Sequence, residues 1–248
     1  MNREKLLKPV LMAALAALLG GCGGTDPEGN TESTGTGPLL PVAVGNSWEY
    51  RVTDKDGVVT QKRTTVLDQE AVGGTGPNAA VMAFKVVTRK GADLNTETGL
   101  DKTESWQGPD PKDSARIVRY RELSYGAMTQ LLQLEEFWQP PRIHIDGSQM
   151  NTKAGAMWIE TYVETKLPVG DVAPAPSEES DYWSVISPDE AIEVPNGRFE
   201  HTVHVRKIAA TGGNEAKDYW YLRGVGKIKE SGAQTEELTH YTVDGVTK

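Results

Sequence analysis

The sequence contains very little cysteine, since Cys22 is the only one among 248 residues. A single thiol cannot close an intrachain disulfide, and it cannot supply the several thiolates of a structural zinc site. Long apolar runs are lacking too. The longest, over residues 10–19, has about half of the ~20 residues that a membrane-spanning helix requires. The sequence therefore predicts neither a disulfide-stabilised domain nor a permanent transmembrane span.

Basic residues are also in deficit, with 26 Lys and Arg against 35 Asp and Glu and a formal net charge of −9. Removing residues 1–21 takes away three basic residues and one acidic residue. The remaining 23 basic and 34 acidic residues give a formal charge of −11. A diffuse negative surface repels phosphate backbones and anionic lipid headgroups. We therefore expect no nucleic-acid partner.

Recognisable catalytic and metal-binding motifs are lacking as well. The sequence has no G-x-S-x-G, no H-E-x-x-H and no S-x-x-K placed before a helix. His201 and His204 are three residues apart and would face opposite sides of a strand. The segment 54–57 is too short for a calcium loop. We expect a protein that is not an enzyme, with no catalytic residue, no metal and no cofactor.

The first residues have the organisation of a secretory signal. Basic residues at the N-terminus precede the apolar run, and small residues follow it. The ending Leu19-Gly20-Gly21-Cys22 resembles the lipobox of bacterial lipoproteins. That resemblance implies a signal peptide over residues 1–21, cleavage before Cys22, and a diacylglycerol and an acylated amino terminus on Cys22. An ordinary signal peptide with an accidental cysteine is the alternative.

Residues 22–39 predict a flexible linker, because the segment is rich in Gly, Thr, Ser, Glu and Pro and poor in large apolar residues. Gly23 stands where, in the best-known lipoprotein sorting system, an aspartate would retain the protein in the inner membrane. By that resemblance we favour an outer-membrane lipoprotein over an inner-membrane lipoprotein. Whether it faces the periplasm or the cell surface stays open.

Residues 40–248 predict one β-rich domain, because apolar residues alternate with polar ones and turn residues separate the runs. Trp48, Tyr50 and Val52, for example, share one face of the first strand. About ten strands with short connections favour an all-β fold. We expect a single strongly curled antiparallel sheet or an open half-barrel, an exposed loop over 169–180, and short helical turns near Asp189. The expected strands are 47–53, 58–67, 82–87, 117–125, 131–138, 157–166, 192–194, 199–208, 219–222, 224–230 and 237–243.

Three short blocks, at residues 41–50, 193–199 and 219–229, resemble conserved blocks of a group of uncharacterised bacterial lipoproteins. The group's domain is described as a curled β-sheet of unknown function, distantly similar to half-barrels that hold lipids. It has no accepted catalytic residue to transfer. Independently of the group, Gly224 and Gly226 predict a bulge or a close approach to the backbone.

Aromatic residues are the main candidates for a binding site, with six tryptophans in the chain. Trp158 and Tyr162 share a strand face with Glu160 and Glu164, and Trp183 follows the acidic loop. Aromatic rings beside carboxylates can hold sugars or cations, so Trp158, Tyr162 and Trp183 form a possible ligand cleft. The alternative is that these rings fill the core. The two glutamates are ~13 Å apart along the strand, too far for a glycosidase pair, and we interpret them as a solvated acidic surface.

These observations favour a lipid-anchored cell-envelope lipoprotein with a non-enzymatic binding or scaffolding domain. Its partners would be the membrane, through Cys22, and an unknown envelope protein, glycan or lipid. A periplasmic carrier of an acyl chain or of a lipoprotein is the second hypothesis. An enzyme with an unrecognised site is the third.

Overall fold

The computed structural model describes residues 37–96, 99–210 and 215–248. The expected signal peptide, Cys22 and most of the expected linker lie outside these residues. The one helical element described is a short 3-10 turn, η1 (Met150–Thr152), and no described helix is long and apolar enough to cross a bilayer. The strands are β1 (Ser47–Asp54), β2 (Val59–Ala71), β3 (Met82–Gly91), β4 (Asp101–Asp110), β5 (Asp113–Tyr125), β6 (Leu132–Asp146), β7 (Met157–Pro168), β8 (Ser177–Val194), β9 (Gly197–Ala209), β10 (Ala216–Leu222), β11 (Gly226–Ser231), β12 (Gln234–Val243) and β13 (Val246–Thr247).

The strands form one antiparallel sheet in which each strand pairs with the next along the chain. β1 also pairs with β12, so β1 to β12 close into a barrel, and the short β13 turns back to pair antiparallel with the end of β12. The expected all-β antiparallel fold is confirmed, but the open half-barrel is wrong. Closure satisfies the backbone N–H and C=O groups of two edges that an open sheet would leave unpaired.

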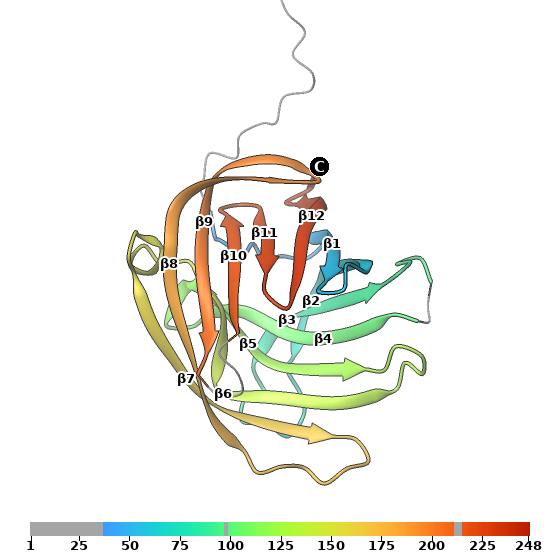
Figure 1. The fold of residues 1–248 in the computed structure, drawn as a ribbon. Coiled ribbons are helices and arrows are strands. Elements are labelled where there is room, and N and C mark those ends of the chain that lie inside the picture. The colour runs from blue at the N-terminus through green and yellow to red at the C-terminus, as the bar shows by residue number, and fades with distance from the viewer. Residues whose placement is uncertain (1–36, 97–98, 211–214) are drawn as a thin grey trace, which may run out of the picture. The chain divides into compact units, whose positions relative to one another are not determined.

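The barrel has two groups of strands that run in different directions (Figure 1). β8 to β12, drawn in orange and red, run roughly up and down the view. β3 to β6 run across it and end in hairpins on the right. The inner faces of both groups contribute side chains to the interior.

One part of the interior is an apolar core. Trp48, Tyr50 and Val52 are all buried, which confirms the face that their alternation predicted. Trp48 Nε1 donates a hydrogen bond of 2.6 Å to the carbonyl oxygen of Val225. The predicted close approach is also present, because a Cβ on Gly226 would lie 2.8 Å from Trp48 Nε1. This contact ties β1 to the turn before β11.

Three local predictions need correction. β4 was not expected, because its polar sequence hides the alternation. β8 begins at Ser177, within the loop expected over 169–180, and Asp189 lies inside this strand rather than in a helical turn. β4 pairs with both β3 and β5, whereas β8 pairs with β7 over its first part and with β9 over its later part. This ladder hydrogen bonding holds the strands extended despite weak local signals.

Candidate functional site

The barrel interior contains a cavity of about 420 Å³ whose lining is mainly basic and aromatic. A smaller hollow of about 90 Å³ shares four of its lining residues, which places the two next to each other. The residues common to both are Lys62, Arg119, His144 and Lys227. Arg142, Lys207 and Lys217 add further positive charge to the larger cavity, and Trp183, Tyr219 and Tyr221 add rings.

Asp181 binds the cations on one side of this cavity. Its Oδ2 atom lies 2.6 Å from Lys207 Nζ and 3.1 Å from Arg142 Nη2, and it accepts a hydrogen bond of 3.1 Å from the Tyr162 hydroxyl. Burial alone would raise the pKa of Asp181, but Lys207 and Arg142 outweigh it and hold the pKa below its ordinary value. The carboxylate therefore stays charged in the interior.

The charge of Lys207 is less completely compensated than the charge of its partner Asp181. Burial and the nearby Arg142 lower its pKa to about 8, because Asp181 is shared between the two cations and compensates neither completely. The ammonium group also lies 5.1 Å from the centre of the Trp183 ring. Lys207 is therefore a partly compensated cation in the cavity wall.

A second charged cluster joins β2, β11 and β12. Glu236 accepts hydrogen bonds from Lys62 Nζ and Lys227 Nζ, at 2.8 and 2.7 Å, and Lys227 also donates to Glu230 at 2.5 Å. Burial would raise the pKa of Glu236, but the two lysines outweigh burial and lower it strongly. Two carboxylates and two ammonium groups thus compensate one another here.

Arg119 and His144 form a pair whose hydrogen bonding fixes the proton on the imidazole. Arg119 Nη2 lies 3.0 Å from His144 Nδ1. A guanidinium has only donors, so Nδ1 must be the acceptor and the neutral ring carries its proton on Nε2. Burial, with the charges of Arg119 and Lys227, lowers the pKa of His144 well below its ordinary value. His144 is therefore a neutral N–H donor in the cavity lining.

Glu160 is buried near the same cavity. It accepts the backbone N–H of Ile143 and, at 3.3 Å, the Nε1–H of Trp183. The regular pairing of β6 with β7 ends at Gln139, just before two prolines that have no N–H to donate. The Glu160 carboxyl group therefore accepts the hydrogen bond of the Ile143 N–H in place of the backbone carbonyl that a regular ladder would supply. Burial raises the pKa of Glu160 to about 7.

The solvated acidic surface expected for Glu160 and Glu164 is wrong. The two residues are 6% and 9% exposed, and Glu164 accepts a hydrogen bond of 3.0 Å from Trp138 Nε1. The alternation correctly put both glutamates on the face of Trp158 and Tyr162. That face points into the barrel, because the outward residue Ile159 is largely exposed.

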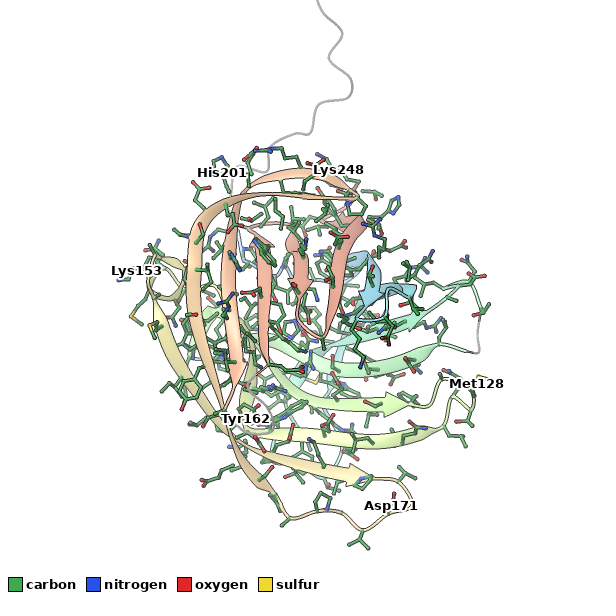
Figure 2. The ribbon with its side chains drawn as sticks, viewed as in Figure 1. Met128, Lys153, Tyr162, Asp171, His201 and Lys248 are labelled. Carbon is green, nitrogen blue, oxygen red and sulfur yellow. The ribbon has the colours of Figure 1, made fainter. Side chains whose placement is uncertain are left out.

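The three residues of the expected cleft all lie on this inner face, but the cavity reaches only one of them. Trp158 and Trp183 stack with 5.7 Å between ring centres and 3° between planes. Trp183 lines the cavity, and Tyr219 continues the row at 6.1 Å. Figure 2 places Tyr162 in the body of the domain, where its hydroxyl binds Asp181. Of the three residues of the expected cleft, only Trp183 thus forms part of the cavity wall.

Among the residues that the structure describes, no group of three His, Cys, Asp or Glu side chains has the arrangement of a metal site. His204 is buried between Glu190 and Asp218, at 2.9 and 3.1 Å. His201 is exposed and pairs with Asp189. Cys22 lies outside the described residues.

Sequence reasoning missed most of the cavity residues, although one signal was available. Val203 and Val205 face inward on β9, and the same alternation places Lys207 inward. The others were missed because a charged residue on a strand is normally assigned to solvent. Their partners come from strands far away in the sequence, so local patterns do not show that they are compensated.

Comparison with protein-family models gives no match, and no curated protein matches the chain. Among solved structures, the fold is similar to that of a Bacteroides fragilis protein that is provisionally described as exported and as having a YmcC-like fold. The two chains share 11% sequence identity with a TM-score of 0.48, over 84% of this chain and 100% of the other. This likeness transfers no ligand and no residue role to the present chain.

Proposed function

We propose that this protein is a lipid-anchored lipoprotein of the cell envelope, held in the outer membrane through Cys22, whose barrel binds a small ligand without catalysing a reaction. The observation that carries the binding function is the interior cavity. Its volume of about 420 Å³ falls in the range of small-molecule sites, roughly 300–1,000 Å³. The signal and lipobox resemblance of residues 1–22 support the anchor.

The cavity lining also bears on the choice between ligands. A carrier of an acyl chain needs a dry apolar trough, because each methylene group gains about 0.8 kcal/mol on leaving water. Here a chain would instead displace water from Lys207, Arg142 and the Arg119–His144 pair. Desolvating charged groups against hydrocarbon is costly. A polar small molecule therefore fits the cavity better than an acyl chain.

Native mass spectrometry of the full chain, isolated gently from envelope membranes, tests ligand binding. We expect a non-covalent small molecule on the wild-type protein. Ala209→Trp should displace it, because Ala209 lines the cavity and the indole would fill it. Thr161→Trp, on the exposed outer face of β7, is the matched control and should keep the ligand. A wild-type protein without bound mass, or equal occupancy in Ala209→Trp, would refute a ligand-binding cavity.

Fractionation tests the anchor separately. Wild-type protein should stay with outer membranes after washing in high salt, and Cys22→Ala should be released. Mass spectrometry of the wild-type N-terminus should show a diacylglyceryl-modified cysteine. A Cys22→Ala protein that remains in the washed membranes contradicts the anchor, whatever the cavity binds.

A further inference from the structure

The cavity has several hydrogen-bond donors that the protein itself leaves available. No hydrogen bond to His144 Nε2 is formed within the described residues, and this nitrogen carries the proton. Arg119 Nε is buried and lacks a partner in the described part of the chain, while Nη1 and Nη2 of the same guanidinium bind Glu122 and His144. Lys207 has three N–H donors, of which Asp181 takes one. These donors come from β5, β6 and β9.

The electrostatic environment of His144 is positive. The charged groups that act most strongly on it are Arg119, Lys227, Lys207 and Lys62, and all four are cations. They disfavour a further proton on the imidazole, which agrees with its lowered pKa. The positive charge of these four groups attracts an anion to the Nε2–H donor. The attraction is strong because the charges are close and water screens them less in the interior than in bulk solvent.

Other parts of the lining suit hydroxyl groups. In the residues described, neither the Tyr219 nor the Tyr221 hydroxyl has a hydrogen-bond partner, and a phenol can both donate and accept. Glu230 and Glu215 add carboxylate acceptors near them on β11 and just before β10. Tyr219 also belongs to the aromatic row with Trp183. Such a mixture of rings, acceptors and donors matches the alternating apolar and hydroxyl-bearing surface of a sugar.

We propose that the cavity binds an acidic sugar, a monosaccharide that carries a carboxylate or a phosphate. Its anionic group contacts His144, Arg119 and Lys207, and its hydroxyl groups contact Tyr219 and Glu230. This proposal rests on the proposed ligand-binding function and adds the chemical class of the ligand. A neutral sugar would leave Lys207 and Arg142 with Asp181 as their one shared counter-ion among the described residues, and a cation would be repelled by them.

Isothermal titration of the full chain in detergent tests the class directly. The probes are glucuronic acid, glucose 6-phosphate, glucose and inorganic phosphate, each at the same ionic strength. We expect one of the acidic sugars to bind at least tenfold more tightly than both glucose and inorganic phosphate. Two acidic probes are used because carboxylate and phosphate share the chemistry that the lining recognises.

Variants then locate the binding. Lys207→Met should weaken binding of the acidic sugar at least tenfold. Lys229→Met, which removes a lysine that pairs with Glu237 outside the cavity lining, should leave it unchanged. Because Lys207→Met also disturbs Asp181, a second variant is needed. His144→Phe removes the N–H donor without changing a charge, and it should weaken binding by a similar factor.

The results separate this inference from the proposed function. Glucose binding as tightly as the acidic sugars overturns the anionic class, and inorganic phosphate binding as tightly overturns the sugar. If neither acidic sugar binds below 10 mM, or if neither cavity variant weakens binding, the inference also fails. The ligand-binding function itself stands or falls on the bound mass displaced by Ala209→Trp.

Discussion

Lys207 Nζ and Asp181 Oδ2 are 2.6 Å apart inside the barrel, and the Asp181 side chain is 1% exposed. The two residues belong to neighbouring strands, β9 and β8. Arg142 from β6 and the Tyr162 hydroxyl from β7 contact the same carboxylate oxygen. One buried carboxylate thus joins four strands, and its removal leaves two interior cations without their counter-ion.

We expect Asp181→Ala to lower the free energy of unfolding by about 3–5 kcal/mol, the cost of leaving buried charges uncompensated. Urea denaturation followed by circular dichroism measures the change. Glu237→Ala is the control, because its partners Arg51 and Lys229 are 50% and 24% exposed and pairs that water reaches contribute about 1 kcal/mol or less. Equal effects of the two substitutions would contradict the structural role of Asp181.

Glu160 should make stability depend on pH in the opposite sense from most carboxylates. Burial raises its folded-state pKa from 4.5 to about 7. Between these values the folded protein keeps a proton that the unfolded chain has lost. The stabilisation is therefore complete below pH 4.5 and is lost as pH rises towards 7. Each pKa unit corresponds to about 1.36 kcal/mol, so the change is on the order of 3 kcal/mol.

The measurement is the unfolding free energy of wild type minus that of Glu160→Gln between pH 4 and 8. Taking the difference removes the contributions of other titrating groups. We expect it to fall by a few kcal/mol over this range. A difference that is constant or that rises with pH would show that Glu160 is not held protonated by burial.

Alternation along the strands was enough to predict which side chains share a face. It placed Trp48 with Tyr50, and Trp158 with Glu160, and the structure agrees at both strands. The glycine at position 226 was equally informative. A close approach to its backbone was expected, and the Trp48 indole makes that approach. These predictions succeeded because each depends on residues a few positions apart.

Closure of the barrel and its charged interior could not be predicted from such short-range sequence patterns. The β1–β12 pairing places Glu49 opposite His240. No local sequence pattern specifies a contact between residues that are so far apart along the chain. Glu160 was assigned to solvent because an isolated strand does not show that Trp183 and Ile143 provide its donors. The candidate site is therefore a property of the closed barrel rather than of any one segment.

Gly226 provides a steric test of the core. Its φ is +115°, and a Cβ there would lie 2.8 Å from Trp48 Nε1. We expect Gly226→Ala to destabilise the protein by about 3 kcal/mol or more, since backbone strain of about 1–3 kcal/mol adds to the displacement of a buried indole. Gly57→Ala is the matched control, with φ of +82° and open space around the Cβ. It should show only the strain, about 1–2 kcal/mol, when both are compared by thermal unfolding.

Closure of the barrel can be tested by an engineered disulfide between its first and last paired strands. Thr53 and Thr235 are direct partners of β1 and β12, so their Cα atoms should be about 4.5–5.5 Å apart, within the range that a disulfide spans. In a Cys22→Ala background, Thr53→Cys with Thr235→Cys should oxidise readily and stabilise the fold by about 2–4 kcal/mol. Thiol titration and non-reducing electrophoresis follow the reaction. Thr53→Cys with Ser187→Cys, on the non-adjacent strand β8, should stay reduced under the same conditions. If the first pair also stays reduced while the protein remains folded, the sheet is open between β1 and β12 and the closed barrel is contradicted.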